Sequence, residues 1–334
     1  MVANIHEVAR RAGVSLGTVS HVLNHPELVA ETTRQRVLRV INEIGFVRNG
    51  SARQLRIGTT QTIGLIVLDV SNPFFTEVAH GAEAAASEHG YLVILCNSGN
   101  SPDKEAHYLD ALAEQRVAGM LIVPSVAYAP QSLRRETPVV LLDRLSKDAN
   151  CCSVSVDDVA GGEMAGKHLL DAGHQRIAYL HGPFTNAQYI DRLEGLRHAV
   201  AQAGHDPNTV IVPLAAAADN AQAGGASVAA FCQIPDRPTA IFCGNDYLAV
   251  GVMHALAECG MVVPRDVALI GYDDIDLAAM FAVPLSTIRQ PKYELGYAAT
   301  ELLLDEITQK EAHTHRQIVF RPELIVRESS RWHR

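Results

Sequence analysis

Apolar residues recur at helical spacing through the first 45 residues of the chain. Ile5 and Val8 share one face of a short segment, Gly13 permits a tight turn, and Ser15 is a residue type that caps helices well. The apolar positions that follow continue this pattern. It predicts three helices around one small core, at residues 5–12, 16–23 and 31–44.

Beyond a polar, glycine-containing linker at 48–62, apolar runs alternate with amphipathic helical stretches. A first set of runs lies at 63–68, 91–96, 119–124 and 139–143, and a second set at 177–180, 210–213, 240–243 and 267–271. Strands that are buried on both faces and separated by helices are typical of doubly wound parallel sheets. The pattern therefore predicts an α/β protein: an all-α N-terminal head and a core of two lobes, each built on a doubly wound parallel sheet.

Polar residues follow several of these apolar runs directly, at 69–75, 143–144, 244–246 and 272–274. Open parallel sheets bind ligands at the carboxyl ends of their strands. A small polar ligand is therefore expected where these segments meet.

Charge is distributed unevenly along the 334 residues, whose net charge is -9. The first 60 residues carry eight Arg and four Glu, which leaves 20 basic and 33 acidic residues for the remainder. A basic head on an acidic body is suited to binding a polyanion such as DNA. Because no apolar run approaches the 18 residues that a membrane helix needs and no signal peptide is recognisable, a soluble, cytoplasmic protein is expected.

The second predicted helix is the candidate for reading DNA, because two helices joined by a short turn form the helix-turn-helix arrangement. Hydroxyl and amide side chains suited to phosphate contacts occur at Ser15, Thr18, Ser20 and Asn24. Leu16 and His21 are the side chains expected to reach base edges, whereas Gly17 has no side chain to do so.

The segment from Asn4 to Asn24, with Val14-Ser15 and Thr18-Val19-Ser20-His21, strongly resembles the N-terminus of the lactose-repressor family of transcription regulators. The resemblance continues through Thr33-Arg34 to Arg321-Pro322-Glu323-Leu324. It implies a homodimeric, ligand-responsive repressor that binds operator double-stranded DNA, with Thr33 in the DNA interface. The core also resembles periplasmic ribose-binding proteins.

The resemblance also implies the division of the chain. The helix-turn-helix domain is expected at 1–48, a hinge helix and linker at 49–60 and the effector-binding, dimerising core at 61–334. The N-lobe is expected at about 61–159 and 289–317, and the C-lobe at about 160–288 and 318–330. In the hinge, Asn49, Arg53, Leu55 and Arg56 are the expected DNA contacts, and Leu55 is the residue that would enter the minor groove.

A monosaccharide is the expected effector, because the matching core residues combine apolar faces with fixed hydrogen-bonding groups. The candidate residues are Asn72, Phe74, Phe75, Asp143, Arg144, Arg192, Asn245, Asp273 and Gln290. If the effector is a monosaccharide, the genes that the repressor regulates are expected to serve carbohydrate utilisation. Two alternatives stay open: a purine or nucleoside effector stacked on the two Phe rings, and a sugar-binding transport protein.

Enzyme, cofactor and metal functions are not expected. The chain contains no G-x-S-x-G, H-E-x-x-H, P-loop or G-x-G-x-x-G motif, and its six cysteines include no C-x-x-C pair. His313 and His315 are two residues apart among polar neighbours, a pattern more often found in an exposed loop than in a metal site.

Overall fold

The computed structural model describes residues 4–46, 60–125, 137–183 and 186–331. The chain forms two compact units, residues 1–60 and residues 61–334. The hinge predictions at Asn49, Arg53, Leu55 and Arg56 lie outside the described residues. Within the described residues, no helix combines the length and the apolar character needed to cross a lipid bilayer.

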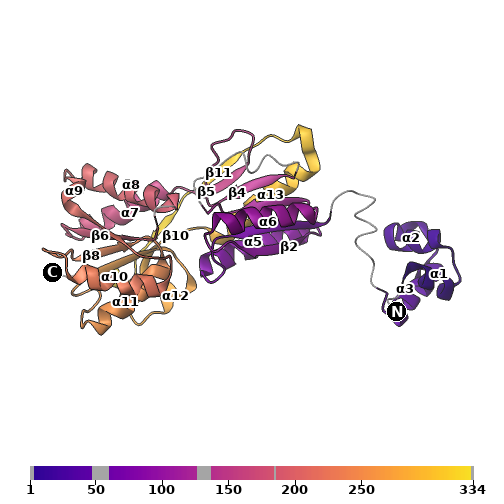
Figure 1. Cartoon of the computed structure of the whole chain (residues 1–334), viewed down its shortest axis with the longest axis horizontal. Coiled ribbons are helices and arrows are strands. Elements are labelled where there is room, and N and C mark those ends of the chain that lie inside the picture. Colours follow the sequence, from indigo (N-terminus) through magenta and orange to yellow (C-terminus); the bar gives the residue numbers. More distant parts are fainter. Residues whose placement is uncertain (1–3, 47–59, 126–136, 184–185, 332–334) are drawn as a thin grey trace. The chain divides into compact units, whose positions relative to one another are not determined.

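Three helices surround a small apolar core in the first unit, drawn in indigo in Figure 1. They are α1 (Ile5–Ala12), α2 (Leu16–Asn24) and α3 (Glu31–Ile44), with the 3-10 helix η1 (Pro26–Leu28) before α3. Val8, Val19 and Val37, one from each helix, are fully buried together. Gly13 ends α1 at a φ of +63°, a left-handed conformation that glycine adopts at little cost. The predicted head is confirmed, with α2 one residue longer.

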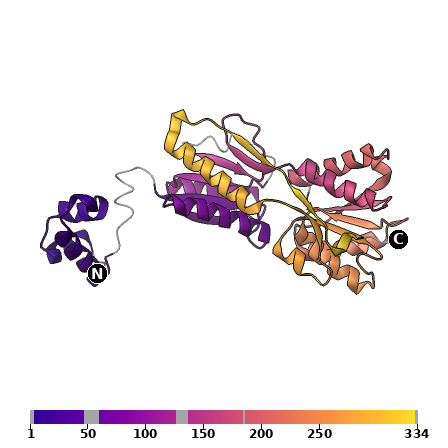
Figure 2. The same ribbon diagram turned by 180° about the vertical axis from the view of Figure 1, so that it is seen from behind.

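The second unit begins with an N-lobe built on a six-stranded sheet in which all pairings are parallel, in the order β11-β5-β4-β3-β1-β2. Its strands are β1 (Thr62–Val67), β2 (Leu92–Asn97), β3 (Gly119–Ile122), β4 (Val139–Leu142), β5 (Ser153–Val156) and β11 (Gln317–Phe320). Helices α5 (Pro73–Glu88) and α13 (Lys292–Gln309) pack over one face, and α6 (Pro102–Glu114) covers the other. Figure 2 shows α13 in yellow across the sheet.

The C-lobe repeats this architecture with the order β12-β10-β9-β8-β6-β7. Its strands are β6 (Ile177–His181), β7 (Ile211–Ala215), β8 (Ala240–Cys243), β9 (Ala268–Asp273), β10 (Ser286–Arg289) and β12 (Glu323–Ile325). Helices α7 (Asp158–Asp171) and α8 (Ala187–Gln202) cover one face, and α10 (Ala221–Cys232) and α11 (Asp246–Glu258) the other. The short elements are α9 (Pro207–Val210), α12 (Asp276–Met280) and η4 (Glu328–Ser330), with η3 (Lys310–Ala312) following α13.

The edge strands differ from the pattern of fully buried parallel strands, and β7 carries exposed residues at the edge of the C-lobe sheet. Strand β12 runs antiparallel to β10 at the edge of the C-lobe sheet. Strand β2, expected to be buried on both faces, lies at the edge of the N-lobe sheet, and the Leu92 side chain is 72% exposed. The predicted strand is confirmed, but its expected burial was wrong because an apolar run does not reveal the order of strands in a sheet. The predicted fold class is otherwise confirmed.

The chain passes between the lobes three times. The passages are at residue 157, between β5 and α7, at 290–291, between β10 and α13, and at 321–322, between β11 and β12. The expected positions were near 159, 288 and 317; β11 extends further because Phe320 still pairs with Val156. Each passage follows the carboxyl end of a strand, so the joined ends of the two sheets face one region.

Candidate functional site

A cleft of about 490 Å³ lies at the carboxyl ends of the strands and is lined by residues of both lobes. We call it the effector cleft. Eight of the nine predicted effector residues line it: Asn72, Phe74, Phe75, Asp143, Arg192, Asn245, Asp273 and Gln290. Arg144 is not among the lining residues. Asp143 has a φ of +57°, which turns the chain immediately before Arg144.

The apolar part of the wall comes from the first turn of α5. Asn72 caps this helix by accepting a hydrogen bond from the Phe74 backbone N–H at 3.0 Å, and Pro73 occupies the first helical position. Phe74 and Phe75 pack edge to face, with ring centroids 5.0 Å apart. Two aromatic rings are thereby fixed beside the polar groups of the cleft.

Arg192, on α8, supplies a buried guanidinium that is held on three sides. Its Nε donates to Asp158 Oδ1 at 2.7 Å, its Nη1 donates to the Gly244 carbonyl at 2.5 Å, and its Cζ lies 3.6 Å from the centroid of the Tyr272 ring. A Cβ on Gly162 of α7 would lie only 2.0 Å from the Arg192 carbonyl oxygen. The glycine therefore permits the close helix packing that sets the position of Arg192.

Asp143 of the N-lobe meets Gln188 of the C-lobe across the cleft. The Gln188 Nε2 donates to the Asp143 carbonyl and to its Oδ2, both at 2.8 Å. Burial, together with repulsion from the Asp158 carboxylate, raises the pKa of Asp143 to about 7, against the opposing effect of Arg192. The carboxyl group is therefore one that changes protonation near neutral pH.

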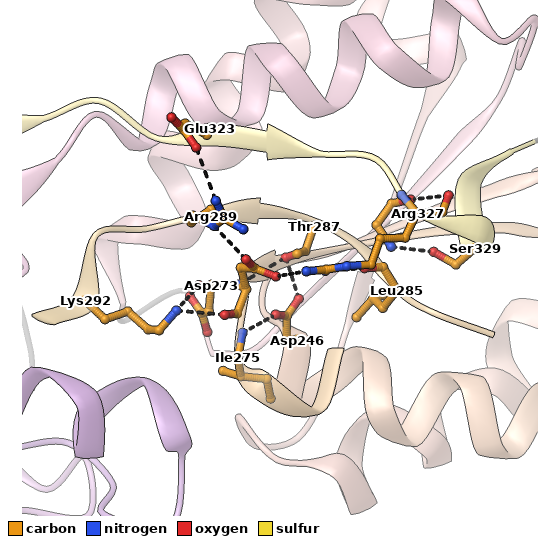
Figure 3. Close-up of polar contacts among 12 residues, drawn as sticks. Asp246, Asp273, Ile275, Leu285, Thr287, Arg289, Lys292, Glu323, Arg327 and Ser329 are labelled. Carbon is orange, nitrogen blue, oxygen red and sulfur yellow. Dashed lines mark hydrogen bonds and ion pairs between the residues drawn. The ribbon is translucent and has the colours of Figure 1, made fainter. Parts of the chain in front are cut away.

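Asp273, at the carboxyl end of β9, is fixed by the polar network of Figure 3. Gln290 Nε2 donates to its Oδ1 at 2.7 Å, and Lys292 Nζ donates to its carbonyl at 2.9 Å. The next residue, Asp274, pairs with Arg289 and Arg327, both at 2.7 Å. Burial raises the pKa of Asp273 to about 6, and the Arg192 guanidinium opposes this shift.

The network of Figure 3 joins four stretches of chain beside a passage between the lobes. Asp246, fully buried at the start of α11, accepts from Thr287 Oγ1 at 2.6 Å and from the Ile275 backbone N–H at 3.0 Å. Lys292 begins α13, which packs in the N-lobe, yet it binds carbonyls of the C-lobe residues 273 and 274. A movement of one lobe relative to the other would therefore change the hydrogen bonds at Asp273 directly.

Sequence reasoning missed a second set of cleft residues: Asn186, Gln188, Tyr189 and Asp219. Tyr189 donates to Asp219 Oδ1 at 2.7 Å and accepts from Asn245 Nδ2 at 3.0 Å. Asn186 Nδ2 donates to Asp219 Oδ2 at 2.9 Å. The spacing of Tyr189 and Arg192, three residues apart on one helix, is a signal that could have found Tyr189.

Four buried acceptor atoms of the cleft residues have no hydrogen-bond partner among the described residues. They are Asp143 Oδ1, Asn186 Oδ1, Gln188 Oε1 and Gln290 Oε1. Buried polar atoms are normally paired, since an unpaired one costs about 1–3 kcal/mol. The cleft is therefore prepared for a ligand that brings several hydrogen-bond donors.

In the head, α2 presents the side chains that the sequence singled out. Ser15 caps the helix by accepting from the Thr18 backbone N–H at 3.1 Å. Leu16 is 40% exposed, and Gly17 and His21 are also exposed. Asn24 Nδ2 donates to the carbonyl of Ser20 at 2.8 Å and to the Ser20 Oγ at 3.1 Å. The DNA contacts of α2 stay a prediction.

Part of the basic charge of the head is paired within α1. Arg10 and Arg11 both bind the carboxylate of Glu7, and these hydrogen bonds lower the pKa of Glu7 to about 2. On α3, Arg34 pairs with Glu31 at 2.5 Å, and Thr33 is half-buried. The positive field available to DNA therefore depends on arginines beyond Arg10 and Arg11 as well.

Comparison with known proteins identifies relatives along nearly the whole chain. Residues 4–49 match the bacterial regulatory proteins of the lacI family, and residues 167–330 match a periplasmic binding protein-like domain. The HTH-type transcriptional repressor PurR of Vibrio vulnificus is 38% identical over 335 residues, covering 98% of each chain. The predicted family resemblance and the two-part fold are confirmed.

Solved structures of related proteins share this architecture. A LacI family transcriptional regulator from Enterococcus faecium, solved with bound ribose, is 30% identical, with a TM-score of 0.74 over 80% of this chain and 98% of that chain. The Lac repressor bound to ONPG in its repressed state is 25% identical, with a TM-score of 0.85 over 99% of this chain and all of that one.

Proposed function

The chain belongs to the lacI family of bacterial regulatory proteins, and we propose that its affinity for operator DNA is controlled by a small molecule bound in the effector cleft. It is a DNA-binding transcriptional repressor. The repressor names of its relatives support binding rather than catalysis, and the lacI match at 4–49 speaks against the transport alternative. Since it acts on chromosomal DNA, the cytoplasm is the proposed location.

The effector that we propose first is a purine base or nucleoside. Relatives at 36–39% identity bear the name PurR, which favours this alternative over the monosaccharide expected from the sequence. The observation that carries the proposal is the set of four unpaired buried acceptors. Ring N–H groups, amino groups and ribose hydroxyls are donors that would satisfy them, while Phe74 and Phe75 offer aromatic surface to the ring.

A monosaccharide is the second candidate. The Enterococcus faecium regulator, 30% identical, holds ribose. Sugar hydroxyls are donors to the same four acceptors, and the C–H face of the ring can pack on Phe74 and Phe75. Under this candidate the regulated genes would serve carbohydrate utilisation.

We also propose that the repressor acts as a homodimer. Large apolar side chains are exposed on the edge strand β2, where Leu92 is 72% and Leu95 45% exposed, and on α12, where Met280 is 75% exposed. Exposed apolar side chains of this size are typical of surfaces that a partner covers. Sedimentation of the full chain at micromolar concentration would give twice the monomer mass.

A ligand screen on the full-length protein tests the effector. Purine bases, nucleosides, pentoses and hexoses are compared by thermal unfolding, in which a ligand at 100 times its dissociation constant adds about 2.7 kcal/mol of stability. Stabilisation by bases or nucleosides alone supports the first candidate, and stabilisation by sugars alone supports the second. The Asp273→Ala variant should lose the effect in either case; equal stabilisation of this variant would place the ligand elsewhere.

A further inference from the structure

A cluster of metal-binding residue types lies in the N-lobe, away from the effector cleft. Cys152 immediately precedes β5, Glu306 lies on α13, and His313 and His315 lie between η3 and β11. Because β5 and β11 are parallel and pair through Ser153 and Gln317, the cluster lies at the amino ends of these strands. The effector cleft lies at the carboxyl ends of the strands, so the two sites lie at opposite ends of the N-lobe strands.

The sequence expectation of an exposed histidine loop was wrong for His313. Its side chain is only 1% exposed, and Cys152 is fully buried. The expectation failed because hydrophilic neighbours in sequence do not show that Cys152, more than 150 residues away, packs against this segment. We refer to Cys152, Glu306, His313 and His315 as the Cys-His cluster.

The distances in the Cys-His cluster are those of a coordination sphere. Cys152 Sγ lies 3.2 Å from His313 Nε2 and 3.7 Å from His315 Nδ1, and the four ligand atoms all lie within 4.8 Å of one another. Tetrahedral zinc, with bonds of about 2.0–2.3 Å, separates its ligand atoms by about 3.3–3.8 Å. Small side-chain adjustments would bring all four atoms to these separations.

Two neighbouring features favour a bound cation. The Asp305 carboxylate lies 2.9 Å from His313 Nδ1, which orients the ring so that the lone pair of Nε2 points into the cluster. Histidine ligands of zinc commonly donate their other ring N–H to a carboxylate in this way. Glu306 Oε2 is buried and has no hydrogen-bond partner among the described residues. A buried acceptor without a partner is destabilising, and a bound cation would compensate it.

A catalytic interpretation of the same residues fails on access. Cys152, His313 and Asp305 follow one another as a nucleophile, base and orienting group would, but a nucleophilic thiol must reach its substrate. The full burial of Cys152 prevents this, whereas burial is compatible with a structural metal site.

We propose that the Cys-His cluster binds one zinc-class divalent ion through Cys152, Glu306, His313 and His315. One thiolate, two imidazoles and one carboxylate suit Zn²⁺ or Co²⁺, whereas Mg²⁺ and Ca²⁺ prefer oxygen ligands alone. The ion would tie the start of β5 to the end of α13 and to the approach to β11. It would thus connect three separated stretches of the N-lobe.

Cobalt titration of the chelator-treated, reduced full-length protein tests this proposal. We expect one Co²⁺ per chain, with a thiolate-to-cobalt charge-transfer band, displacement by Zn²⁺ and no displacement by Mg²⁺. Cys152→Ser should abolish the band. Cys151→Ser is the matched control, because Cys151 Sγ lies toward the Val139 and Cys152 carbonyls rather than the cluster, and it should keep the band.

Two further variants decide the matter if the buried Cys152→Ser chain does not fold. His315→Gln, at a half-exposed position, should weaken Co²⁺ binding at least tenfold. Asp305→Asn should keep the charge-transfer band but weaken binding about 10–100-fold, as loss of a supporting carboxylate does elsewhere. Absence of saturable Co²⁺ binding in the wild-type chain, or unchanged affinity in His315→Gln, would overturn the proposal.

Discussion

At the scale of single residues, Asp143 couples the effector cleft to pH. Its carboxyl group is buried beside Asp158, and its pKa is raised to about 7. Between about pH 4 and 7 the folded protein therefore holds a proton that the unfolded chain has released. The contribution of Asp143 to the free energy of unfolding then falls as pH rises through this window, by up to about 1.4 kcal/mol per pH unit.

The Asp143→Asn variant should lose this decline between pH 6 and 7, while the decline below pH 6 that Asp273 contributes remains. Denaturant unfolding at a series of pH values measures the slope. Asp171→Asn, at a side chain 66% exposed, is the control and should follow the wild type. Identical slopes in the wild-type and Asp143→Asn proteins would show that Asp143 is ionised throughout.

His21 is the exposed side chain of α2 that we expect to read a base. His21→Ala should relax discrimination at one operator position, at a cost of about 1–3 kcal/mol. Binding of a library of operator variants measures this. His6→Ala, at an exposed position on α1, should leave the preference intact. Uniform weakening at every operator position would assign His21 to the phosphate backbone instead.

At the scale of elements, the packing of α7 on α8 sets the position of Arg192. Gly162→Ala would place a Cβ 2.0 Å from the Arg192 carbonyl oxygen, so the helices must separate, at a typical cost of about 1–3 kcal/mol. The Arg192–Asp158 pair should loosen and effector affinity should fall at least tenfold, as calorimetry would measure.

Gly17→Ala is the matched control for Gly162→Ala. A Cβ on Gly17 meets only Ser15 Oγ, at 3.6 Å, which is an ordinary contact. This variant should stabilise α2 by up to about 1 kcal/mol and leave effector affinity unchanged. Retention of full effector affinity by Gly162→Ala would show that Arg192 does not depend on this helix contact.

The sequence predicted those elements whose pattern is local. The helices of the head and eight of the strands were found, whereas β5, β10, β11 and β12 were not. All four residues of β5 are buried, yet Ser153 and Ser155 interrupt the apolar run; Ser153 accepts from the Ser146 backbone N–H at 3.1 Å. A buried strand with hydroxyl groups is recognisable only when its neighbours are known.

The same limit applies to the effector cleft. Asn72, Asp143 and Asp273 were found because each follows an apolar run at a strand end. Gln188 follows no such run, and only the fold brings it to the wall. Asp219 follows the apolar stretch 211–218, a signal that the sequence analysis did not use. Local sequence therefore predicts groups at strand ends, while contacts across the cleft depend on tertiary structure.

At the scale of the whole molecule, effector and operator must change each other's affinity by the same factor if the effector cleft controls the head. We predict that Leu55→Gly weakens operator binding sharply and leaves effector affinity unchanged in the absence of DNA. Gly50 lies in the segment 49–60, where the family resemblance implies a hinge helix and linker. Gly50→Ala should tighten operator binding, since Ala favours a helix over Gly by about 1 kcal/mol.

Titrations of operator with and without effector, and of effector with and without operator, measure the coupling. Removal of residues 1–60 should abolish operator binding while effector affinity persists, because the core forms a separate unit. Unequal coupling factors in the two directions would show that the measurements are not at equilibrium. A coupling factor of one in both directions would show that binding in the effector cleft does not control DNA binding.

The three passages between the lobes have a consequence for how the protein is made. A nascent chain that has reached residue 290 contains every strand of the N-lobe except β11, but it lacks α13, whose Leu295, Leu302 and Leu303 complete the N-lobe core. At this stage β5 is an unpaired edge of the N-lobe sheet, because its partner β11 has not been made. Strand β10 likewise lacks its partner β12 in the C-lobe sheet. Neither lobe can therefore complete its fold on the ribosome well before the other. A chaperone that binds the nascent chain would meet two incompletely folded lobes until residue 325 has emerged.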